Sequence, residues 1–198
     1  IHLSKVPYSP SNIDKHRKII LRVLRIALDK GLIKWTISEK KIFRPKIIEH
    51  KSIHLLPVEI KMIENLITID HSEKQATDLF LLMCYTGQSF ADIKKLHPTE
   101  VQFQENNQIK FWSFQRQKTK NPISLVLTNS AMEIIKKYNY DFSLTMANAT
   151  FNKTIKEVCK NAGITNEVTA SLGGKVQTLP KFRFVTAHTG RRTCLTNL

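Results

Sequence analysis

The chain has 198 residues, 41% of them hydrophobic, and its 31 Lys and Arg against 16 Asp and Glu give a formal net charge of +15. That hydrophobic content can bury a core, which argues against a disordered chain, and no apolar run reaches the ~20 residues needed to span a bilayer. The positive charge favours nucleic acid as the partner, because each phosphate that a protein neutralises releases a counterion. A generally basic surface and an anionic membrane surface are the alternatives.

The three cysteines, Cys84, Cys159 and Cys194, are few and far apart. They fit neither a disulfide framework nor a zinc site, so we expect a protein of the reducing cytoplasm. Cys84 lies in an apolar run and is expected in the core. No signal peptide is visible, and Ile1 is not a start methionine, so we expect a fragment of a longer protein.

Residues 1–50 are rich in Lys and Arg, and the sequence predicts one helix among them. Ser11 or Asn12 is a candidate N-cap, and Gly31 is a candidate stop for a helix that runs to about Lys30. One helix with a basic tail cannot bury a core alone. We therefore expect residues 1–50 to be the end of a larger helical unit, followed by a basic linker around Pro45.

Residues 51–198 are predicted to form a second unit that is mainly α with a small antiparallel β-hairpin. Pro57 favours a helix start, and Gly87 favours the end of a buried helix. Strands rich in β-formers are expected on either side of a turn at 118–122. The predicted helices cover residues 57–67, 73–85, 90–96, 130–138, 151–162 and 188–198, the predicted strands cover 109–117 and 123–127, and residues 165–185 are expected to form a loop or a small hairpin.

The segment HTGRRT, residues 188–193, contains the first candidate site. His188 and Arg191 are three residues apart, so on a helix they share one face. A guanidinium can hold two phosphate oxygens, and an imidazole beside it can donate a hydrogen bond or move a proton. The plainer interpretation is a surface histidine among ordinary basic residues.

The segment QRQKTK, residues 115–120, contains the second candidate site. Side chains alternate along a strand, so Arg116 and Lys118 are expected to point the same way. A lysine at a hairpin tip can hold a phosphate or protonate a leaving oxygen. A solvated hairpin end is the alternative.

The segment CYTGQSFADIKKL, residues 84–96, contains a corner where two helices meet. The exposed N–H groups at the start of the second helix favour anions. A plain helix–turn–helix corner is the alternative.

In this order, these segments resemble the catalytic domain of the tyrosine recombinases, the phage integrase family. LLPVEIKMIENL resembles the first helix of that domain, YTGQSFADIKKL its T-G-x-R-x-x-E/D-I-x-x-L box, and HTGRRTCLTNL its H-x-x-R-H/R-T-x-x-T box. The hairpin with Lys118 resembles the lysine-bearing hairpin of the family. The last box is similar to that of Bacteroides-type mobile-element (conjugative transposon) integrases, and residues 1–50 resemble the end of the helical, SAM-like core-binding domain.

The resemblance implies site-specific DNA recombination and integration, by cleavage and rejoining through a 3′-phosphotyrosine, with no metal and no cofactor. Arg191 and His188 would stabilise the charge that develops on the phosphate, and Lys118 would be the general acid. Double-stranded DNA is the expected partner, with a tetramer of the full-length protein on DNA, a monomeric fragment and no membrane. Further DNA contacts are expected from Arg17, Arg22, Lys120 and Arg192.

Two departures from the family pattern qualify this expectation. Ser89 occupies the first-arginine position, and a serine carries no charge for a phosphate. Arg116 is our candidate replacement. The four tyrosines, Tyr8, Tyr85, Tyr138 and Tyr140, all precede His188, so we expect a fragment that ends before the nucleophile and binds DNA without cleaving it.

Two other functions stay open at this stage. One is a non-catalytic DNA-binding integrase homologue, which Ser89 favours. The other is a basic RNA-binding protein, for which the sequence lacks an aromatic-rich motif of the RNA-recognition type.

Overall fold

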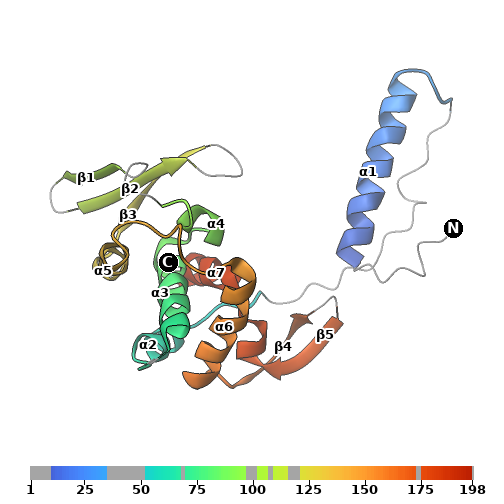
Figure 1. The fold of residues 1–198 in the computed structure, drawn as a ribbon. Coiled ribbons are helices and arrows are strands. Elements are labelled where there is room, and N and C mark those ends of the chain that lie inside the picture. Colours follow the sequence, from blue (N-terminus) through green and yellow to red (C-terminus); the bar gives the residue numbers. More distant parts are fainter. Residues whose placement is uncertain are drawn as a thin grey trace. The chain divides into compact units, whose positions relative to one another are not determined.

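The computed structural model describes residues 10–34, 52–67, 70–96, 102–106, 109–115, 121–172 and 175–197 (Figure 1). The chain divides into two compact units, each of which is described by itself. The first combines Ile1–Lys51 with Thr169–Gln177, and the second combines Ser52–Val168 with Thr178–Leu198.

In the first unit, α1 spans Pro10–Asp29. Proline suits the first turn of a helix, where its missing N–H costs no hydrogen bond. The expectation of an N-cap at Ser11 or Asn12 was wrong, because both residues lie inside the helix. The predicted stop is confirmed: Gly31 has a φ of 68°, and the N–H of Leu32 donates to the carbonyl of Ala27 at 2.9 Å.

The second unit is built around α3, His71–Thr86, most of whose residues from Ala76 onward are buried. Asp70 caps its start by accepting from the N–H of Glu73 at 2.9 Å, and the left-handed Gly87 ends it at a φ of 64°. Among the described helices, α3 is contacted by the short α4, Phe90–Ile93, and by four longer ones: α2 at Pro57–Glu64, α5 at Asn129–Lys137, α6 at Asn148–Asn161 and α7 at Ala187–Asn197. The helix α4 follows Gly87 directly.

The first sheet is antiparallel and has the order β1-β2-β3, with β1 at Gln102–Asn106, β2 at Ile109–Gln115 and β3 at Pro122–Leu127. The predicted hairpin of β2 and β3 is confirmed, with Trp112 opposite Leu125. Trp112 and Leu127 are buried, so the sheet contributes to the core beside α3. The strand β1 was not predicted from the sequence.

A second hairpin follows α6, with β4 at Glu167–Leu172 and β5 at Lys175–Pro180. It confirms the hairpin that was one of two expectations for residues 165–185. The 3₁₀ helix η3, Lys181–Phe184, then leads into α7. Within the described part of the chain, no helix is both long and apolar enough to cross a bilayer.

Candidate phosphate-binding site on α7

The helix α7 carries the His188–Arg191 motif and lies very close to α3 (Figure 1). Gly190 faces α3, and a Cβ at this position would lie 2.9 Å from the Cβ of Met83. Thr189, Gly190 and Thr193 are buried, whereas His188 is exposed and Arg191 is half-buried. The helix therefore buries one side against the core and presents the two candidate phosphate ligands on its other side.

The corner between α3 and α4 lies beside α7. A Cβ at Gly87 would come within 3.2 Å of the Sγ of Cys194, so the corner touches α7 at Cys194. Arg191 precedes Cys194 by three residues and so lies on the same face, about one helical turn away. Arg191 therefore lies about one helical turn from the point where α7 meets the corner that contains Ser89.

Ser89 itself is occupied as the N-cap of α4. Its Oγ accepts from the N–H of Asp92 at 3.2 Å and donates to the Oδ2 of Asp92 at 2.7 Å. A serine here satisfies a helix start that has few other partners, which is a structural role. It brings no positive charge to the corner.

The surroundings of His188 on α7 favour its neutral form. Partial burial, followed by the charges of Arg192 and Arg191, lowers the pKa of His188 below its ordinary value of 6.5. A phosphate bound between the imidazole and the guanidinium would oppose these effects, because it stabilises the charged imidazolium. The pair is therefore suited to accept a proton when an anion binds.

Two of the four tyrosines are held by carboxylates. The Tyr85 hydroxyl donates to Glu64, and the Tyr138 hydroxyl donates to the Oδ2 of Asp78 at 2.9 Å. Burial and the neighbouring carboxylates raise the pKa of both phenols well above the ordinary value of 10. Neither hydroxyl is suited to act as a nucleophile, in keeping with the sequence-based expectation.

The remaining predicted contacts are spread over the chain. Arg17, on α1, donates from its Nε to the Oδ1 of Asp14 at 3.0 Å, while Arg22 is exposed on the same helix. Arg192 is half-buried on α7. Arg116, Lys118 and Lys120 lie outside the described residues, so their roles stay predictions.

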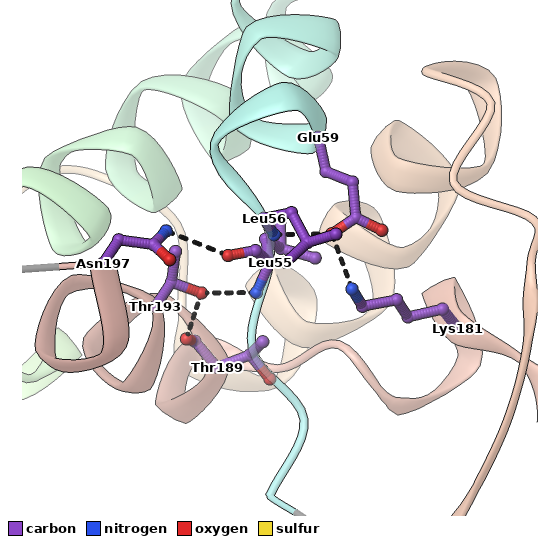
Figure 2. A network of polar contacts seen from close by, with 7 residues as sticks. All are labelled: Leu55, Leu56, Glu59, Lys181, Thr189, Thr193 and Asn197. Carbon is purple, nitrogen blue, oxygen red and sulfur yellow. Dashed lines mark hydrogen bonds and ion pairs between the residues drawn. The ribbon is translucent and has the colours of Figure 1, made fainter.

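Sequence reasoning missed a buried polar network that connects the start of α2 with η3 (Figure 2). The Lys181 Nζ lies 2.5 Å from the Oε2 of Glu59, and both side chains are under a tenth exposed. The Oε2 of Glu59 also accepts from the N–H of Leu56 at 2.6 Å. A signal for Glu59 was available, because it occupies the third position of a helix that begins at Pro57, where a capping box places Glu.

Gln88, at the corner, was also missed. Its side chain is 2% exposed, and its Nε2 donates to the carbonyl of Thr86 at 2.9 Å. Its Oε1 has no hydrogen-bond partner among the residues that the structure covers. In the same part of the chain, no three His, Cys, Asp or Glu side chains are grouped as metal ligands.

The chain matches no protein-family profile and no curated protein by sequence. By fold, it is similar to the integrase of transposon Tn1549 in complex with circular intermediate DNA, with a TM-score of 0.64 and 11% identity over 96% of this chain and 66% of that one. It is also similar to the XerH site-specific recombinase bound to its difH substrate in a pre-cleavage complex. The TM-score is 0.51, with 14% identity over 89% of this chain and 52% of that one.

The fold is that of a tyrosine recombinase catalytic domain. The expected mainly helical fold with small antiparallel sheets is therefore confirmed. The chain spans less than two thirds of the length of each of these two recombinase structures. At these identities the likeness establishes the fold, and the site residues and the Bacteroides-type affinity stay predictions.

Proposed function

We propose that this chain belongs to a tyrosine-type site-specific recombinase, and that it binds double-stranded DNA with one phosphate held by Arg191 and His188. The observation that carries the proposal is the position of α7. This helix buries one side against α3 and leaves His188 exposed and Arg191 half-buried on the same helix, within a fold shared with two recombinases whose structures contain DNA. The net charge of +15 supports a polyanionic partner.

The chemistry follows from the two side chains. The guanidinium of Arg191 donates two parallel hydrogen bonds to non-bridging phosphate oxygens, and it retains its charge as the phosphorus becomes pentacoordinate. The lowered pKa of His188 favours the neutral imidazole in the free protein, and a neutral imidazole can accept a proton or donate from one ring nitrogen. Lys118 would protonate the leaving 5′ oxygen, as the family resemblance implies.

Ser89 supports a second candidate function. Because its hydroxyl is used within α4, the first-arginine position contributes no charge to a phosphate. A non-catalytic DNA-binding homologue of the integrases would have this property. In an active enzyme, Arg116 would supply the missing guanidinium.

Covalent capture of DNA distinguishes the two functions. The natural full-length protein is incubated with sheared DNA of its source, denatured in SDS, and the DNA that remains attached is sequenced. A recombinase gives protease-sensitive adducts that are enriched at one or a few sequences. A non-catalytic homologue retains DNA before denaturation and none after it, and absence of DNA binding would refute both functions.

Two alanine variants of this protein test the role of Arg191. Arg191→Ala is expected to lower covalent capture by about 100-fold or more, because it removes charge stabilisation that is needed as the phosphate reacts. Lys74→Ala removes the same charge from an exposed position in the first turn of α3. That position lies 12 residues before Thr86, or about 18 Å along the helix, so capture should be unchanged. Equal effects of the two variants would indicate a general charge effect and no specific phosphate site.

A further inference from the structure

The segment before α2 has no regular secondary structure, yet it is firmly held. Leu55 is fully buried, and residues 52–56 form neither a helix nor a strand. Buried backbone N–H and carbonyl groups require hydrogen-bond partners. In most such segments neighbouring backbone supplies them, but for Leu55 the partners are side chains of α7.

Both backbone groups of Leu55 bind α7 (Figure 2). Its N–H donates to the Oγ1 of Thr193 at 2.9 Å, and its carbonyl accepts from the Nδ2 of Asn197 at 3.0 Å. The Thr193 hydroxyl in turn donates to the carbonyl of Thr189 at 2.8 Å. Thr193 is fully buried, so water cannot replace either hydrogen bond.

A second contact holds η3, the 3₁₀ helix that leads into α7. Lys181, at the start of η3, pairs with Glu59 at 2.5 Å, and Glu59 also binds the N–H of Leu56. His188 and Arg191 therefore lie in the chain between two anchors, Lys181 before them and Thr193 after them. Both anchors are fixed to the same short stretch, residues 55–59.

We propose that Thr193 is a positioning residue: by holding Leu55, it fixes α7 so that Arg191 and His188 meet one phosphate together. This inference rests on the proposed function and deepens it, because it names what sets the geometry of that site. Leu55 lies three residues after Ser52, where the second unit begins. The latch of Thr193 and Asn197 on Leu55 thus joins the site helix to the start of the unit.

The experiment has to distinguish two roles of the Thr193 hydroxyl, stabilising the fold and positioning α7. Thr193→Val keeps the shape of the side chain and removes both hydrogen bonds, whereas Thr193→Ser keeps the hydroxyl. Thr196 offers a matched control, because its Oγ1 donates to the carbonyl of Arg192 at 2.9 Å from an exposed position on α7. Thr196→Val removes the same kind of bond within the helix and leaves Leu55 untouched.

The test measures coupling between Thr193 and Arg191 in the natural full-length protein. Affinity for a fluorescent duplex is measured by anisotropy at 0.1 M salt, well below the midpoint of thermal unfolding of every variant. In the unaltered protein, Arg191→Ala should weaken binding by about eightfold. One phosphate contact contributes about 0.9 to the slope of log affinity against log salt concentration, which amounts to about eightfold between 1 M and 0.1 M salt. In the Thr193→Val background the same substitution should weaken it less than twofold. Thr193→Ser and Thr196→Val should preserve the eightfold effect.

Three outcomes decide the inference. An undiminished effect of Arg191→Ala in the Thr193→Val background overturns the positioning role, and so does an equal loss of the effect in the Thr196→Val background. If Arg191→Ala has no effect in the unaltered protein, the proposed function fails at this residue. In that case the NMR titration of His188 tests separately whether the contact of Thr193 with Leu55 positions α7. A midpoint moved by Thr193→Val and restored in Thr193→Ser supports the positioning role, and an unmoved midpoint overturns it.

Discussion

The buried pair of Glu59 and Lys181 allows a quantitative prediction. The exposed fractions of the two side chains are 9% and 8%, and the Nζ and Oε2 atoms lie 2.5 Å apart. We expect Lys181→Met to lower the free energy of unfolding strongly, because it leaves the buried carboxylate of Glu59 with the N–H of Leu56 as its one remaining partner among the described residues. Loss of one partner of a buried ion pair typically costs about 3–5 kcal/mol.

The double variant should be much closer to the original protein. Glu59→Gln retains an oxygen that can accept from the N–H of Leu56, and Lys181→Met provides an apolar side chain of similar length. With both charges removed, what remains is about one lost hydrogen bond, or ~1 kcal/mol. The coupling between the two substitutions should therefore be about 2–3 kcal/mol or more.

Urea unfolding, followed by far-UV and near-UV circular dichroism, measures all four proteins of the cycle. A contrast is available in Lys137→Met, because Lys137 pairs with Asp78 while its side chain is 43% exposed. Solvent screening limits the expected cost there to ~1 kcal/mol or less. If the effects of Glu59→Gln and Lys181→Met simply add, the pair is not coupled and the reasoning is refuted.

Three further predictions concern the site. The ring of His188 should titrate below 6.5 in the free protein and higher with DNA bound, so duplex affinity should rise as the pH falls between the two midpoints; an NMR midpoint insensitive to DNA would contradict this. Ser89→Ala should lower the free energy of unfolding by about 1 kcal/mol, because it removes the hydrogen bond that caps the N–H of Asp92. An unchanged midpoint of urea unfolding would show that this cap does not stabilise the protein. Gly190→Ala should destabilise the protein: a Cβ 2.9 Å from that of Met83 costs about 1–3 kcal/mol, more than the ~1 kcal/mol gained in helix propensity. A raised urea midpoint would show that α7 can shift.

The C-terminal ends of α1 and α3 were predictable from the sequence because a glycine marks each of them. Gly31 and Gly87 have positive φ values, a conformation that glycine adopts without strain. The strand β1 was not predictable in the same way. Its sequence QFQEN is largely polar, and its pairing with β2 depends on a neighbouring strand rather than on its own residues.

The candidate site was predictable in part. Spacing alone placed His188 and Arg191 on one face of a helix, and the structure adds which surface of that helix is buried. Lys181 could not be recognised, because a lysine is normally exposed and its partner Glu59 lies 122 positions away in the chain. Long-range pairs of this kind follow from packing, which no local pattern encodes.

The latch on Leu55 has a consequence for how relatives of this protein can vary. Thr193 and Asn197 bind the backbone of position 55 and not its side chain. Any residue except proline offers those two groups, so position 55 is restricted only by the apolar space that its buried side chain fills. The side chains at positions 193 and 197 have to supply the hydrogen bonds. Natural variants should therefore interchange Leu, Ile, Val and Met at 55 with little effect, while position 193 retains a hydroxyl.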